Sequence, residues 1–76
     1  ITIYLFHKSG RGNKYQAECS KNNGVWYVMM WQILGKSSRV MCMGWAVSLY
    51  TGKVFPYFKI RKKLKEVARV YDITTA

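Results

Sequence analysis

The chain has 76 residues, of which half are apolar, 16% are aromatic and thirteen are Lys or Arg, giving a formal net charge of +10. This composition excludes a disordered chain, which combines high charge with low hydrophobicity, and the length excludes several domains. A domain this small buries only about 60% of the surface that its unfolded chain exposes. We therefore expect one small basic domain, residues 1–76, with more apolar surface than its interior holds, which favours self-association.

Only three acidic residues oppose the positive charge, so the chain should attract polyanions such as nucleic acid or an acidic protein surface. Two cysteines, Cys19 and Cys42, are too few for a secreted disulfide scaffold. They favour a cytoplasmic, reducing environment with structural thiols, although one disulfide stays open. Together with the single His7 they fall short of four zinc ligands, so no metal or other cofactor is expected. No apolar run approaches the ~20 residues of a membrane span.

Turn-forming residues divide the chain at four points: "SGRGN" (9–13), "KNNG" (21–24), "GKSS" (35–38) and "TGK" (51–53). The segments between them are rich in β-branched and aromatic residues, as strands are, and comprise residues 1–8, 14–20, 25–34 and 39–50. The sequence therefore predicts an α+β fold. It is a small antiparallel β-meander of about four strands with one C-terminal amphipathic helix packed on one sheet face.

The second and third strands differ in how their apolar residues are arranged. In the second, Tyr15, Ala17 and Cys19 alternate with polar residues, which is typical of an edge strand with one solvated face. The third is apolar on both sides, with Val25, Tyr27, Met29, Trp31 and Ile33 on one and Trp26, Val28, Met30 and Leu34 on the other. One helix covers only one face, so the other face is expected to bind a second copy or an aromatic ligand.

Residues 39–50 are interpreted as a strand, because Gly44, the valines and Trp45 disfavour a helix. The helical alternative stays open, since Ser38 could cap such a helix and Gly52 follows its end. In the strand, large residues alternate with small ones, namely Cys42, Gly44, Ala46 and Ser48. We expect the C-terminal helix to approach the sheet over this face of small side chains.

Residues 56–71 have a clear helical period, and Pro56 suits a first turn. The apolar positions fall on one narrow stripe that should face the core: Tyr57, Ile60, Leu64, Val67, Ala68 and Tyr71. Cations occupy the rest of the circumference: Lys59, Arg61, Lys62, Lys63, Lys65 and Arg69. An exposed helix ordinarily mixes charges of both signs, so this excess indicates contact with a polyanion, although basic stretches also serve solubility alone.

Aromatic residues on strands with cations at the strand ends are typical of proteins that stack bases and neutralise phosphates. The predicted nucleic-acid-binding residues are Lys8, Arg11, Lys14, Lys36, Arg39, Lys59, Lys62, Lys63, Arg69, Trp26, Tyr27 and Trp31. Arg11 lies between two glycines in a predicted hairpin tip, from which it could reach a phosphate. The competing interpretation is that the aromatics form the core and the cations solvate it.

The sequence thus favours a small, non-enzymatic, self-associating nucleic-acid-binding module for DNA or RNA. A protein-interaction module is the alternative, such as a phage-type inhibitor that binds an acidic surface of a larger protein. A third hypothesis is a basic RNase toxin that uses Lys, Arg and Tyr. No set of nucleophile, base and orienting group lies in one neighbourhood, so no catalytic residues are predicted.

Overall fold

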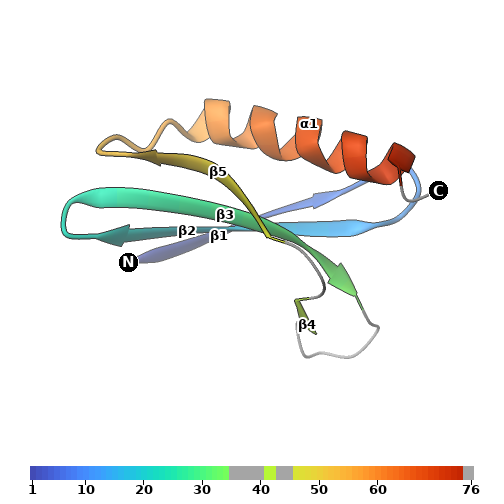
Figure 1. The fold of residues 1–76 in the computed structure, drawn as a ribbon, viewed down its shortest axis with the longest axis horizontal. Coiled ribbons are helices and arrows are strands. Elements are labelled where there is room, and N and C mark those ends of the chain that lie inside the picture. Colours follow the sequence, from blue (N-terminus) through green and yellow to red (C-terminus); the bar gives the residue numbers. More distant parts are fainter. Residues whose placement is uncertain (35–40, 43–45, 75–76) are drawn as a thin grey trace.

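The computed structural model describes residues 1–34, 41–42 and 46–74. Its elements are β1 (Thr2–Lys8), β2 (Lys14–Asn22), β3 (Val25–Leu34), β4 (Met41–Cys42), β5 (Val47–Gly52) and α1 (Tyr57–Thr74). The strands form one antiparallel sheet in the order β1-β2-β3, and both β4 and β5 pair with β3. Figure 1 shows α1 lying along one face of this sheet. The predicted α+β class, an antiparallel sheet followed by one helix, is confirmed.

β2 lies between β1 and β3, so the prediction that it is an edge strand was wrong. The apolar and polar residues of β2 alternate instead because the helix covers only one face of the sheet. The side chains on the other face of each strand are not covered by the helix. β2 also continues two residues past Ser20, because the turn to β3 is confined to Asn23 and Gly24. Their φ angles of 51° and 76° match a two-residue hairpin turn of type I′.

The fourth predicted strand is present as two separate strands, β4 and β5, and Ala46, which precedes β5, belongs to neither. The predicted turn at 35–38 and residues 39–40 and 43–45 lie outside the described residues. β5 continues through Gly52 into the predicted turn at 51–53. The pairing of β3 with β5 shifts between Val28 and Met29, which leaves Leu49 as the extra residue of a β-bulge.

The helix packs on the large residues of β5 and not on the small ones, so that expectation was also wrong. Leu49 is buried in the core and Val47 packs against it, whereas Ala46 and Ser48 are exposed. Ser48 pairs with Met29, whose side chain lies on the sheet face away from α1. Burying two branched apolar side chains removes far more apolar surface from water than close approach over Ala and Ser would.

The core lies between α1 and the sheet, with Ile60, Leu64 and Ala68 of the helix fully buried. Val67 and Tyr71 pack at its margin, which confirms most of the predicted stripe. Tyr57, at the first position of α1, is 42% exposed and does not belong to the buried stripe. The helix extends past residue 71 because Asp72 continues the same face and is buried as well.

Cys19 is a free thiol on the helix side of β2, where it has no exposed surface. Burial raises the pKa of the Cys19 thiol, and the charge of neighbouring Glu18 raises it further. The thiol is therefore a structural part of the core, as predicted, and not a reactive one.

Candidate nucleic-acid interface

The sheet face away from α1 carries large apolar side chains that the helix does not cover. We call it the open face and define it by Tyr4, Phe6, Tyr27, Met29, Trp31 and Ile33, with Lys8 and Lys14 at one end. Tyr4, Phe6 and Tyr27 are 52%, 56% and 47% exposed. Three exposed aromatic rings on one sheet face form the kind of surface that marks an interaction site.

The strand register fixes how these rings are spaced. Phe6 pairs with Gln16, which in turn pairs with Trp31, so the two rings lie two strands apart, about 10 Å. Gln16 between them is buried although it is polar. The indole N–H of Trp31 is buried too and has no hydrogen-bond partner in the part of the chain that the structure describes. Such a donor is unusual in a folded protein.

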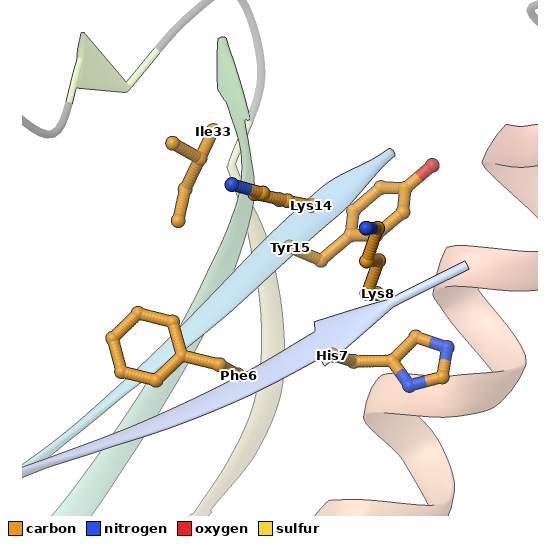
Figure 2. Close-up of a pocket in the computed structure, with 6 residues that line it drawn as sticks. All are labelled: Phe6, His7, Lys8, Lys14, Tyr15 and Ile33. Carbon is orange, nitrogen blue, oxygen red and sulfur yellow. The ribbon is translucent and has the colours of Figure 1, made fainter. Parts of the chain in front are cut away.

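The positive charge of the open face is concentrated at one end. Lys8 and Lys14 are exposed and directly opposite each other across β1 and β2, and Ile33 is the partner of Lys14 on β3. A pocket of about 370 Å³ opens here and is lined by Phe6, His7, Lys8, Lys14, Tyr15 and Ile33. Figure 2 shows Phe6, Lys14 and Ile33 on one side of the strands, and the His7 and Tyr15 rings pointing the other way.

Of the predicted aromatic residues, Tyr27 and Trp31 lie on the open face and Trp26 does not. Trp26 is buried on the helix side, with its ring centroid 4.6 Å from that of Phe55 and the Lys21 ammonium 5.9 Å above it. Adjacent strand residues point to opposite faces, so Trp26 and Tyr27 cannot both be exposed on one surface. Tyr4 and Phe6, in contrast, were missed as site residues, although their alternation with Ile3 and Leu5 gives the signal.

The predicted helix cations lie on the other side of the molecule from the open-face rings. Lys59, Lys62, Lys63 and Arg69 are exposed on α1, with the core and the sheet between them and the open face. Two helix cations also contact the backbone of the outer strands. Arg61 donates to the Phe6 carbonyl at 3.2 Å, and Lys63 donates to the Leu49 carbonyl at 3.4 Å. The predicted cations and aromatics therefore form two separate surfaces. Lys36 and Arg39 lie outside the described residues.

Arg11 does not extend freely from its hairpin tip. Its guanidinium donates to the backbone carbonyl of Asp72 at 3.2 Å, near the C-terminal end of α1. Three further side chains donate to one carboxylate oxygen of Asp72: Asn13 at 2.6 Å, Ser9 at 2.9 Å and Tyr15 at 3.3 Å. Asp72 therefore ties the β1–β2 hairpin to the helix. Figure 1 shows the end of α1 next to this hairpin.

The environment of Asp72 favours its charged form. The hydrogen bond from Asn13 lowers the pKa of the Asp72 carboxyl most, and burial opposes this shift. The bonds from Ser9 and Tyr15 and the charge of Arg11 lower that pKa further, so it lies below its ordinary value. Burial, followed by the charge of Asp72 and their hydrogen bond, raises the pKa of Tyr15. Tyr15 therefore stays a neutral donor, and Asp72 an ionised acceptor, at neutral pH.

No family model, curated protein or solved structure matches the chain. Within residues 1–34, 41–42 and 46–74, no helix has the length and apolar character that a membrane span requires. The same residues contain no cluster of His, Cys, Asp or Glu suited to a metal ion. The case for a function therefore depends on the geometry of the open face.

Proposed function

We propose that the protein is a small, non-enzymatic module that binds single-stranded DNA or RNA on the open face. The observation that carries this proposal is the placement of three exposed aromatic rings and an adjacent pair of lysines on the sheet face away from α1, which no helix in the described part of the chain covers. The buried thiol of Cys19 and the net charge of +10 are consistent with a cytoplasmic protein that meets polyanions.

The open face suits unpaired bases better than a duplex. The bases of a duplex stack on one another and present only their edges, whereas the bases of a single strand can stack on protein rings. Tyr4, Phe6 and Tyr27 would provide these stacking surfaces, each contributing about 1–3 kcal/mol per base. Lys8 and Lys14 would neutralise phosphates at one end of the same face.

The cations of α1 have a different part in this proposal. They face away from the stacked bases, and charges farther apart than about 10 Å are largely screened at 0.1 M salt. These helix cations would therefore not hold the bases. They would attract the strand and contact the phosphates that flank the bound bases: Lys59, Lys62, Lys63 and Arg69.

Replacing Phe6 and Tyr27 together by Ala should weaken binding of a single-stranded oligonucleotide of about 12 nucleotides by at least about tenfold, because two stacking surfaces are lost. Fluorescence anisotropy with a labelled oligonucleotide at two salt concentrations measures this. The matched control is Phe58→Ala, which removes an 85%-exposed aromatic ring from α1 instead of the open face. That variant should bind like the wild type.

Two results would count against the proposal. If Phe58→Ala weakens binding as much as the open-face variant does, the open face is not the site. If the wild-type protein binds neither DNA nor RNA at low salt, the charge serves another purpose. The alternative, a module that binds the acidic surface of another protein, would then take its place.

We further propose that the protein self-associates through the open face when no strand is bound. Two copies stacked face to face would remove the rings of Tyr4, Phe6 and Tyr27 from water. Sedimentation velocity at micromolar concentrations should show a dimer that a single-stranded oligonucleotide dissociates, since both use one surface. Tyr27→Glu should yield a monomer, whereas Phe58→Glu should not. A species of single-chain mass at every concentration would contradict this prediction.

A further inference from the structure

The Lys8–Lys14 pair places two positive charges at neighbouring positions at one end of the open face. The two residues are direct partners across β1 and β2, on the same face, and like charges in that position destabilise a sheet. Neither lysine forms an ion pair with a described residue. Glu18, the acidic residue of β2 on this face, lies four residues beyond Lys14, about 13 Å along the strand. A bound anion would relieve this repulsion.

The pocket beside these lysines has an apolar wall as well as a charged rim. The Phe6 ring and the Ile33 side chain lie on the same side of the sheet as the Lys14 side chain, as Figure 2 shows. The volume of the pocket, about 370 Å³, is at the small end of the range for ligand sites, roughly 300–1,000 Å³. The pocket therefore suits one ring system with one charged group attached, such as a single nucleotide.

We infer that this pocket binds the phosphorylated end of a single strand. The terminal base would lie against Phe6 and Ile33, and the terminal phosphate would lie between Lys8 and Lys14. A phosphate monoester carries a charge of about −1.5 to −2 at neutral pH, whereas an internal diester carries a single charge. Two adjacent lysines match the terminal group better. This assignment rests on the proposed function, because the pocket is one end of the open face.

The test compares oligonucleotides of one sequence that carry a 5′-phosphate, a 3′-phosphate or hydroxyl groups at both ends. Wild-type protein should bind one of the phosphorylated strands about tenfold more tightly than the hydroxyl-ended strand, since charge-assisted hydrogen bonds are added. Lys14→Gln should bind the phosphorylated and the hydroxyl-ended strands with equal affinity, whereas Lys14→Arg should keep the preference. The control Lys65→Gln, an exposed helix cation, should keep it too.

A second measurement does not depend on strand binding. A nucleoside monophosphate should raise the melting temperature of the wild type more than the nucleoside or inorganic phosphate does, and should not do so for Lys14→Gln. Lys14→Gln without ligand should melt no lower than the wild type, because it removes one of two like charges at directly opposite strand positions.

The outcomes separate this inference from the proposed function. Equal affinity for all three strands, with dependence on Phe6 and Tyr27 retained, would overturn the inference alone. An equal effect of Lys14→Gln and Lys65→Gln on the preference for the phosphorylated strand would overturn the inference as well, because the preference would then depend on total charge and not on the position of the lysine. Equal melting shifts with inorganic phosphate and with the monophosphate would rule out a nucleotide pocket. Failure of every strand to bind would overturn both proposals.

Discussion

Replacing Leu64 by Ala is expected to lower the free energy of unfolding by about 2–5 kcal/mol. Leu64 has no exposed surface and lies midway along the buried stripe of α1, between Ile60 and Ala68. The loss combines the removed apolar contact with the cavity that stays behind, because surrounding side chains collapse only in part. Small domains have total stabilities of about 5–15 kcal/mol, so the variant should lose a large share of its stability.

Urea or thermal unfolding followed by circular dichroism measures this loss. Lys65→Ala is the matched control, because Lys65 is the next residue of the same helix and is exposed. It should change the free energy of unfolding by less than about 0.5 kcal/mol. Similar losses in both variants would mean that the helix does not dock through the stripe around Leu64.

Replacing Asp72 by Asn should lower the melting temperature at neutral pH, and the deficit should shrink in acid. Asn13, Ser9 and Tyr15 all donate to one Asp72 oxygen, and these bonds favour the ionised carboxylate. A carboxyl whose pKa is lowered on folding stabilises the protein above its unfolded pKa, ordinarily about 3.9. That contribution is lost as the pH falls through the lowered, folded value.

Melting temperatures of wild type and Asp72→Asn should therefore differ by a constant amount between pH 7 and pH 5. They should begin to converge as the pH falls below about 4, the ordinary pKa of the carboxyl, and should meet only below the lowered pKa of the folded carboxyl, where the wild-type side chain is also neutral. Glu66→Gln is the control, since Glu66 is exposed on the same helix, and it should follow the wild type throughout. A difference that is the same at pH 3 and pH 7 would show that the charge of Asp72 does not hold the hairpin to the helix.

The periodicity of the chain predicted its elements well, because periodicity depends on local spacing. Residues 60, 64 and 68 follow the helical repeat, and the structure buries all three. Continuing the same spacing by four residues leads to Asp72, which an apolar pattern does not reveal because an acidic residue does not count in it. Its partners lie about 60 positions away in the hairpin, and no local pattern reveals such contacts.

The sheet face that the helix covers was harder to predict than the alternation of side chains along each strand. The sequence separated Trp26 and Tyr27 onto opposite sides of β3, as observed, but could not tell which side the helix covers. The same ambiguity misplaced the helix over the small residues of β5, where the bulge at Leu49 also changes the alternation. The face that the helix covers also determines which cations lie beside which aromatic rings. The predicted site therefore combined residues of two separate surfaces, the open face and the exposed side of α1.

The contacts of Arg61 and Lys63 with the outer strands have a consequence for how copies of this chain can meet. Among the described strands, β1 pairs only with β2 and β5 only with β3, so each has a side with unpaired backbone groups. Such sides recruit strands from other molecules and seed aggregation, and natural proteins protect them with charge. Arg61 donates a hydrogen bond to the Phe6 carbonyl of β1, and Lys63 donates one to the Leu49 carbonyl of β5. An incoming strand would have to displace a cation at either side, so a chain that is half apolar resists polymerising strand by strand.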